Sequence, residues 1–562
     1  MGESDNASRV AELLEQRQQL TDALADSPYD IILYLRRAVV YADLDYPDLA
    51  SGDAYRALLL TDEISDESFE YHEQAYEAMS MYVGTVPGIL VEVEDLVPAT
   101  ASDNDDKDET APDASDEDVA GDLQECQRMA RVAAIRCYQI LGASLLLCGC
   151  LRSAYDFCQR GLAATAPAQD KELLQTKENV DAEARRRLRE LGRGEDYSPT
   201  ELPNRGSVRR EVYPWNTYEP NRSSPESLAY LNELLATAAP KCEVRATELP
   251  VLVEDVAAAT TGGTCIQLGV FAKEDIAAGE PVLREYSLLT ANNRLKESAC
   301  DACGMQLPSI DKAVNCPDCY DTVFCDDFCF EQAQERYHPA VCEKDVDTIA
   351  KDPENARDAD DALYVLLLAR LLAMAAHQEA HPLEVDEVKF IWGDFITTEN
   401  RVAALPFSFE ANIATPLHIL EKMDLDVFAE LDVYDVWVCN TLYAKFRGTA
   451  SARKSRRDGR PDVAAVHPLW CLANHDCDPN VSWEWGGRMV LWAKEERANL
   501  TLTQDKDAAK RPGGIKADQE ILNHYCDINL PVQQRREWAS GSLGGWCMCQ
   551  RCQNEAAAAV EA

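Results

Sequence analysis

Residues 300–342 hold a dense group of side chains that can bind metal ions. A Cys-x2-Cys turn presents two thiolates to one ion, and a structural zinc ion takes four sulfur or nitrogen ligands. Because so short a segment has little apolar surface to bury, zinc binding would supply the free energy that folds it. Four closely spaced pairs predict two zinc sites: Cys300 and Cys303, Cys316 and Cys319, Cys325 and Cys329, and His338 and Cys342.

A second group of thiols lies near the end of the chain, in the sequence WCMCQRC, which contains Cys547, Cys549 and Cys552. Three thiolates lack the fourth ligand of a structural zinc site. Our candidate for that ligand is Cys477, in the upstream sequence NHDCDPN, and the spacing leaves Cys471 and Cys526 open as alternatives. Such a third zinc would attach the end of the chain to the centre of a folded domain.

The overall composition limits the partners and the compartment. The 562 residues carry a formal net charge of -45, and a field of that sign repels nucleic acid. A basic cluster at residues 445–460 is the exception and could touch nucleic acid or an acidic protein face, although we favour a solvated loop. The 21 cysteines, with no secretory signal in MGESDNASRVAELLEQ, predict reduced or metal-bound thiols in a cytoplasmic or nuclear protein.

The predicted secondary structure that positions these residues differs between the two halves of the chain. About the first 240 residues have apolar side chains three and four positions apart, which predicts helices. The apolar stretches 132–151 and 362–376 are interrupted by polar side chains, so we expect buried helices and no membrane span. Two stretches share one spacing of mostly small residues, Ala38, Tyr41, Ala50, Ala54 and Ala57 in the first and Gly142, Leu145, Ala154, Cys158 and Gly161 in the second.

That spacing resembles the small-residue skeleton of tetratricopeptide helical hairpins. Any antiparallel helix pair packed through alanine and glycine is the alternative. Between the two hairpins, residues 92–122 carry many acidic and few large apolar side chains, which predicts a disordered insertion. It is either a surface that attracts basic partners or, as we favour, a solvated loop.

The second half of the chain has a different pattern. Short apolar runs with glycine between them, starting at Cys265, predict strands. Helical periodicity returns at residues 343–435, and the pattern is strand-like again from Val463. We therefore predict one β unit that is split by a small metal-binding insert and a helical insert.

The order of these motifs resembles a known family. NHDCDPN at 474–480, EILNHYCD at 520–527 and the C-x-C-x2-C tail resemble the SET domain of protein lysine methyltransferases, over residues 240 to 552. The ligand pairs at 300–342 resemble the MYND zinc finger, which implies interleaved pairs: Cys300, Cys303, Cys325 and Cys329 on one ion, and Cys316, Cys319, His338 and Cys342 on the other. The chain thus looks like a SET and MYND protein, of the fungal or protist type with amino-terminal helical repeats.

The resemblance implies a function. Such proteins transfer a methyl group from S-adenosylmethionine to a lysine side chain of a histone or another protein, and three zinc ions per chain are expected here. The MYND finger would receive proline-containing peptides. Tyr525 would be the catalytic residue, and the cofactor-binding residues would be Gly269, Val270, Phe271, Asn440, Asn474, His475 and Trp546.

The chemistry explains why a tyrosine would be needed. Methyl transfer from a sulfonium to an amine is an in-line displacement that requires a neutral lysine, whose pKa an apolar aromatic channel lowers. Tyr525 would orient the amine, and water could remove the proton. Two departures from the family pattern, Gln267-Leu268-Gly269 and Asp518-Gln519-Glu520-Ile521, leave the alternative of a catalytically inactive adaptor that binds proteins through its finger and repeats.

The predicted fold class is a multidomain α+β protein. A helical-repeat region precedes a split SET β fold with a MYND insert and a zinc-bound tail. The predicted segments are 1–91 (helical, tetratricopeptide-like), 92–122 (acidic insertion), 123–197 (helical, tetratricopeptide-like), 198–240 (linker), 241–299 (first part of the SET fold), 300–342 (MYND finger), 343–435 (helical insert), 436–530 (SET core) and 531–562 (zinc tail).

Overall fold

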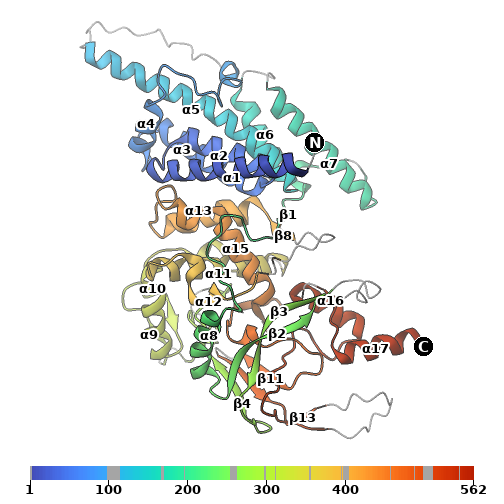
Figure 1. Ribbon diagram of the computed structural model, residues 1–562. Helices are drawn as coiled ribbons and strands as arrows, with labels where there is room; N and C mark the ends of the chain where they lie inside the picture. Colours follow the sequence, from blue (N-terminus) through green and yellow to red (C-terminus); the bar gives the residue numbers. More distant parts are fainter. Residues whose placement is uncertain are drawn as a thin grey trace. The chain divides into compact units, whose positions relative to one another are not determined.

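The computed structural model describes residues 3–561 except 98–113, 166–169, 195, 253–262, 296–298, 310–311, 354–355, 394, 396–403, 456, 486–487, 498–510 and 544. The described residues form two compact units (Figure 1). Unit 1 comprises Met1–Arg209 and Ala404–Asn440, and unit 2 comprises Arg210–Ala403 and Thr441–Ala562. Part of the predicted acidic insertion lies outside the described residues, and a helix already begins at Ala114 within its predicted span.

Unit 1 is mainly helical, as predicted for the amino-terminal region. Its longer helices are α1 (Glu3–Asp26), α2 (Ile31–Asp43), α3 (Pro47–Ser65), α4 (His72–Ser80), α5 (Ala114–Leu147), α6 (Leu151–Ala164) and α7 (Lys171–Glu190). Asp30 caps α2 and Asp170 caps α7, because each carboxylate accepts hydrogen bonds from backbone N–H groups of the first turn. Helices α2 and α3 pack together, as do α5 and α6 (Figure 1).

Small side chains occupy the contacts between these helices. Ala50 and Ala54 of α3 are fully buried. A Cβ atom on Gly142 of α5 would lie 2.7 Å from the sulfur of Cys158, so any larger residue would push α6 away. The two predicted stretches of small residues are therefore helix contacts, as both interpretations require, and their tetratricopeptide character stays a prediction.

Helix α5 contains the most apolar stretch of unit 1. Its residues Gly121–Leu147 are long and apolar enough to cross a membrane, and 61% of the most apolar window is buried inside the protein. The helix packs on α2, α3, α6 and α7 within unit 1. Since a buried core helix passes the same test, we interpret α5 as the central helix of unit 1.

Residues 404–440 fold with the amino-terminal helices. Strand β8 (Ala404–Phe407) pairs with β1 (Gly206–Arg209), and α13 (Thr415–Lys422) and α14 (Leu431–Tyr434) follow it. The buried guanidinium of Arg37 is 2.6 Å from Asp53 and 3.2 Å from Asp435, which also faces Arg56 at 3.7 Å. This part of the predicted helical insert 343–435 therefore belongs to unit 1, because its buried charges pair with those of α2 and α3.

Unit 2 contains most of the strands, and all its paired strands are antiparallel. They are β2 (Cys242–Pro250), β3 (Thr264–Ala272), β4 (Pro281–Glu285), β5 (Thr290–Asn292), β6 (Val314–Asn315), β7 (Val323–Phe324), β9 (Ser451–Lys454), β10 (Pro461–Ala465), β11 (Val481–Trp485), β12 (Met489–Ala493), β13 (Glu496–Arg497) and β14 (Arg511–Pro512). Strand β4 joins β12 and β11 in one sheet, and β5 joins β10 and β9 in another. Strands before residue 300 thus pair with strands after residue 460.

The helices of unit 2 surround these sheets. They are α8 (Pro225–Ala238), α9 (Asp327–Arg336), α10 (His338–Val341), α11 (Ala356–His377), α12 (Asp386–Lys389), the greater part of α15 (Val436–Thr449), α16 (Val532–Leu543) and α17 (Gln550–Glu561). One apolar core joins Leu231 of α8, Val270 of β3, Leu283 of β4, Leu491 of β12 and Ile521. This core fixes the backbone on which the predicted active-site residues lie.

Candidate active site

Three segments that are distant in sequence meet in unit 2. The NHDCDPN segment runs parallel to the segment before Tyr525, where Asn523 N–H donates to Asn474 O at 2.8 Å and Asp476 N–H donates to Asn523 O at 2.8 Å. Strand β3 joins them, because Ile521 N–H donates to the carbonyl oxygen of Val270 at 2.7 Å. The backbone therefore brings Gly269, Val270, Phe271, Asn474, His475 and Tyr525 to one place.

Tyr525 is held at both ends. Its hydroxyl donates a hydrogen bond to Ala473 O at 2.9 Å, and its backbone N–H donates to Nδ1 of His475 at 3.0 Å. Burial raises the pKa of the phenol above its usual range. The hydroxyl is therefore protonated at neutral pH and, while it donates to Ala473, keeps a free lone pair.

Gly269 has no room for a side chain. A Cβ atom at this position would lie 2.6 Å from Oε1 of Glu520 and 3.2 Å from Nδ2 of Asn474. The Asn474 amide donates to Glu520 at 2.7 Å and to the carbonyl of Leu268 at 3.0 Å. Desolvation raises the pKa of Glu520, and the bond from Asn474 opposes that shift. A glycine, an amide and a carboxylate thus share one small space.

Aromatic side chains surround Tyr525. The ring centroid of Trp470 lies 6.4 Å from that of Tyr525 and 5.8 Å from that of Trp483. Trp483 in turn stacks on His524 at 5.6 Å. The indole nitrogens of Trp470 and Trp483 are buried and have no hydrogen-bond partner among the residues that the structure describes. None of these three residues was among the predicted site residues. The flanking of NHDCDPN by WCL and VSW is the signal that could have found Trp470 and Trp483.

A buried carboxyl group supports this aromatic cluster from β4. Glu285 accepts hydrogen bonds from the backbone N–H groups of Leu469 at 2.9 Å and Trp470 at 2.8 Å. Desolvation raises its pKa to about 7, and the two N–H bonds limit that shift. Glu285 therefore fixes the backbone at Trp470, a role that the isolated sequence did not indicate.

Two of the predicted cofactor residues have other surroundings. Asn440 belongs to unit 1, where its amide donates to Asp48 at 2.8 Å and accepts from Asn412 at 2.9 Å. Trp546 is half-buried, and the guanidinium of Arg536 lies 5.3 Å above its ring. Their roles in cofactor binding stay predictions.

The cysteine pairs of residues 300–342 come together in two groups, which we call the finger clusters. Zn–S bonds of about 2.3 Å in a tetrahedron place ligand atoms about 3.8 Å apart. The Cys303 and Cys325 sulfurs are 3.8 Å apart, and Cys319 Sγ is 3.6 Å from Nε2 of His338. The geometry fits zinc, and the interleaved membership agrees with the prediction: Cys300, Cys303, Cys325 and Cys329, and Cys316, Cys319, His338 and Cys342.

The terminal cysteines form a third group, the tail cluster, which consists of Cys477, Cys547, Cys549 and Cys552. The Cys477 sulfur is 3.4 Å from that of Cys552 and 4.0 Å from that of Cys547, distances on either side of the spacing expected for zinc ligands. The structure therefore selects Cys477 among the three candidates. Cys471 contacts Thr449 O instead, at 3.6 Å, and Cys526 belongs with His475 and Cys477 to a further group whose ligand atoms lie within 4.8 Å.

The comparisons with known proteins match the same part of the chain. The SET domain family matches residues 267–526. This protein contains a SET domain. The predicted relationship to SET and MYND methyltransferases is supported by the "SET domain-containing protein SmydA-8, isoform B" of Drosophila melanogaster, which is 26% identical over 51% of this chain and 55% of its own length.

A second relative is the "Histone-lysine N-methyltransferase ATXR4" of Arabidopsis thaliana, which is 28% identical over 16% of this chain and 23% of its own length. The chain thus spans about half of the fly relative and about a quarter of the plant relative. The matched SET domain contains Gly269, Asn474, His475 and Tyr525 and encloses both finger clusters. It ends before the tail cysteines.

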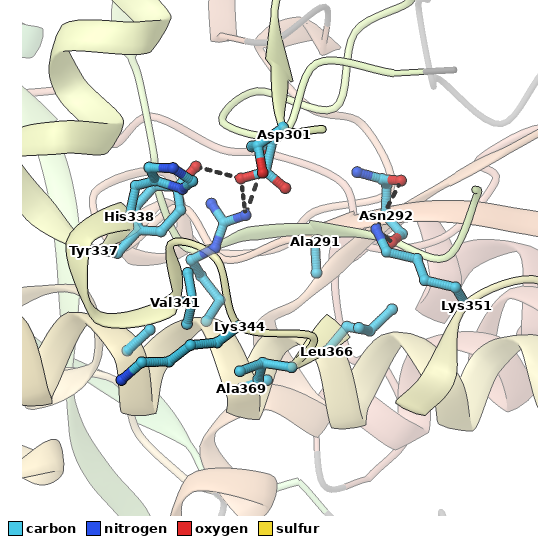
Figure 2. A pocket seen from close by; sticks show the side chains of 14 residues that line it. Ala291, Asn292, Asp301, Tyr337, His338, Val341, Lys344, Lys351, Leu366 and Ala369 are labelled. Atoms are coloured by element: carbon cyan, nitrogen blue, oxygen red, sulfur yellow. Dashed lines mark hydrogen bonds and ion pairs between the residues drawn. The ribbon is translucent and has the colours of Figure 1, made fainter. Parts of the chain in front are cut away.

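A small cavity of about 60 Å³ lies where the finger meets α11 of the SET domain (Figure 2). Asp301 accepts hydrogen bonds there from the Tyr337 hydroxyl at 2.6 Å and from Arg370 at 2.9 Å, and the Arg370 guanidinium lies 3.6 Å from the centre of the Tyr337 ring. On the opposite side, Lys351 donates to the carbonyl of Asn292 at 2.8 Å. None of the predicted cofactor residues lines this cavity, and its polar contacts fix the finger on α11.

The basic cluster 445–460 makes many internal contacts in unit 2. Lys445 is fully buried and lies 2.9 Å from Glu219. Arg453 donates to Gly304 O at 2.9 Å, and Arg460 donates to Pro353 O at 3.3 Å. The favoured solvated loop therefore does not describe the start of this cluster, because Lys445 is buried in helix α15, and contact with nucleic acid stays a prediction.

Proposed function

We propose that this protein is a protein-lysine N-methyltransferase that uses S-adenosylmethionine. The observation that carries the proposal is the placement of Tyr525, whose hydroxyl and backbone N–H are both held by residues 473–475 inside the matched SET domain. The name of the plant relative adds histones as one candidate class of substrate. Other lysine-containing proteins are equally suitable on the chemistry.

The residues around Gly269 suit the cofactor. The absence of a side chain there lets Asn474 and Glu520 approach the backbone of β3 closely. Glu520, which sequence analysis noted only as a departure, offers a carboxylate that would bind the ammonium group of the cofactor through a charge-assisted hydrogen bond. When bound, S-adenosylmethionine supplies an electrophilic methyl group.

Tyr525 and its aromatic neighbours would prepare the lysine. With its proton directed at Ala473 O, the Tyr525 oxygen would accept a hydrogen bond from the incoming amine and orient the nitrogen lone pair. The apolar faces of Trp470 and Trp483 would desolvate the ammonium form and lower the pKa of the lysine. Water would take the released proton.

The remaining expectations complete the proposal. We propose zinc in the two finger clusters and the tail cluster, three ions per chain, with a structural role because all four ligands of each come from the protein. The finger would act as a MYND module for proline-containing peptides. The protein would work in the cytoplasm, the nucleus or both.

The test combines methyl transfer with cofactor binding. The zinc-loaded full chain is incubated with methyl-labelled S-adenosylmethionine and a protein extract, and cofactor binding is measured by calorimetry. We expect labelled protein bands and saturable binding. No labelled band together with no binding would refute the enzyme and favour the adaptor, which uses the finger and helices alone.

A further inference from the structure

The side chain of His475 lies between Tyr525 and the tail cluster. Its Nδ1 atom is 3.0 Å from the backbone nitrogen of Tyr525, and its Nε2 atom is 3.3 Å from the sulfur of Cys477. The imidazole ring is also tilted against the Tyr525 ring, with centroids 5.3 Å apart. One side chain therefore contacts both the catalytic segment and a metal ligand.

The hydrogen bond at Nδ1 fixes the proton on the ring. A backbone N–H can only donate, so Nδ1 of His475 must be the acceptor from Tyr525. The proton of the neutral imidazole then lies on Nε2, and Nε2–H can donate to the Cys477 sulfur.

This tautomer decides the role of the group formed by His475, Cys477 and Cys526, whose ligand atoms lie within 4.8 Å of one another. A metal ion would need the lone pair of Nε2, but that nitrogen carries the proton because the lone pair of Nδ1 is already used. His475 is therefore suited to act as an outer partner of the tail cluster and not as a ligand of a second ion.

We propose that His475 is a positioning residue that couples the tail cluster to Tyr525. A metal ion in the tail cluster fixes the Cys477 sulfur, the sulfur fixes the imidazole through Nε2–H, and Nδ1 fixes the Tyr525 backbone. Outer partners of this kind orient metal ligands and tune the site. The link to catalysis rests on the proposed methyltransferase function, whereas the link to the metal does not.

Two substitutions separate the two contacts. In His475→Asn the side-chain oxygen lies near the former Nδ1 and can still accept from Tyr525, but no donor reaches Cys477. In His475→Gln the amide nitrogen lies near the former Nε2 and can still donate to Cys477, but the acceptor for Tyr525 is lost. His524→Asn is the matched control, since the imidazole of His524 faces the carbonyl of Cys526 at 3.2 Å and no cluster sulfur.

Zinc release to a colorimetric chelator is measured on the full chain, and Cys552→Ser identifies the phase that belongs to the tail cluster. We expect His475→Asn to accelerate that phase about 10- to 100-fold, with a smaller change in His475→Gln and none in His524→Asn. If the phases of zinc release from the two finger clusters are unchanged, the variant is folded. Equal release rates in wild type and His475→Asn would overturn the proposal.

Nitrogen-15 NMR of the histidine rings and steady-state kinetics complete the test. The signals of the His475 ring are those that are absent from the spectrum of His475→Asn, and in the wild type they should show the proton on Nε2. In steady-state kinetics, His475→Gln should lower kcat more than it raises the KM of the cofactor. A proton on Nδ1 would overturn the coupling. If the wild type transfers no methyl group but the NMR and zinc results hold, the proposed function fails and the structural link stands.

Discussion

The finger clusters and the tail cluster both consist mainly of cysteines, with His338 in one finger cluster, but these residues are distributed differently along the chain. All eight ligands of the finger clusters come from residues 300–342. The tail cluster instead joins Cys477, which lies within the NHDCDPN segment, to cysteines at 547–552. The finger clusters therefore organise their own segment, whereas the tail cluster holds the end of the chain to the segment that contacts Tyr525.

The side chains that contact the finger and the tail cluster also differ. The finger contacts α11 through Asp301, Tyr337 and Arg370, away from the active site. The tail cluster is contacted by Arg535 of α16, whose guanidinium lies 3.4 Å from the Cys552 sulfur and 2.7 Å from Glu555. Clusters of similar composition can thus join residues of one short segment or segments that are distant in sequence, depending on where their members come from.

The largest effect is expected when the tail cluster is broken. Cys552→Ser should lose one zinc ion per chain and lower methyl transfer by at least about 100-fold, because the Cys477 sulfur is no longer fixed. Cys316→Ser, the matched variant in a finger cluster, should also lose one ion but keep most of its methyl transfer. Metal analysis and a methyl-transfer assay check both variants. An equal loss of methyl transfer in the two variants would remove the distinction between the clusters.

Tyr525→Phe tests the active site without touching a cluster. We expect kcat to fall about 100-fold, with an unchanged zinc count and little change in the KM of the cofactor, because a positioned hydroxyl is removed. Tyr337→Phe is the control, since that phenol bonds to Asp301 beside the finger. Steady-state kinetics measure both. A similar kcat in Tyr525→Phe and Tyr337→Phe would contradict the role of Tyr525.

Glu520→Gln should act on cofactor binding. The loss of a carboxylate that bonds to Asn474 beside Gly269 should raise the KM of the cofactor about tenfold and leave kcat less affected. Glu280→Gln is a suitable control, because the Glu280 carboxylate bonds to Lys241 at 2.8 Å on the surface. If both variants have the same KM as the wild type, Glu520 does not contact the cofactor.

Glu285 should affect the free energy of unfolding, in a way that depends on pH and does not involve a metal cluster. We expect this effect to be smaller than those above. Burial raises its pKa from 4.5 to about 7, so the folded state binds the proton more tightly than the unfolded state. Stability should therefore fall as the pH rises from 4.5 to 7, by about 3 kcal/mol for this group. Glu285→Gln should flatten that dependence in urea unfolding followed by tryptophan fluorescence. An identical pH dependence in the variant would show that Glu285 is not the titrating group.

Much of the metal chemistry could be predicted from the sequence, because a Cys-x2-Cys turn places its ligands by local geometry alone. For the partner of the terminal cysteines, the sequence indicated Cys477 as the candidate but left Cys471 and Cys526 open, since the three differ only in long-range packing. The order of the motifs predicted a SET domain with Asn474 and Tyr525 among its site residues. The pairing of their segments, through Asn523 N–H and Asn474 O, joins distant parts of the chain and is not encoded in the spacing of residues.

Other features required the structure because their signals are weak in a single chain. Trp470 and Glu285 are ordinary core residue types, and only their contacts connect them to Tyr525. The assignment of residues 404–440 to unit 1 follows from the ion pairs of Asp435 with Arg37 and Arg56. Helical periodicity predicts that such a segment is helical but does not predict which neighbour it packs against.

The central claim is that this chain methylates lysine side chains in an active site that contains Tyr525. Identification of the labelled amino acid tests this claim most directly. Protein labelled by the zinc-loaded wild type with methyl-labelled S-adenosylmethionine is hydrolysed, and the label is assigned by mass spectrometry. We predict Nε-methyllysine as the labelled product and about 100-fold less of it with Tyr525→Phe. Label on another amino acid, or an equal yield of methyllysine from the two proteins, would contradict the account.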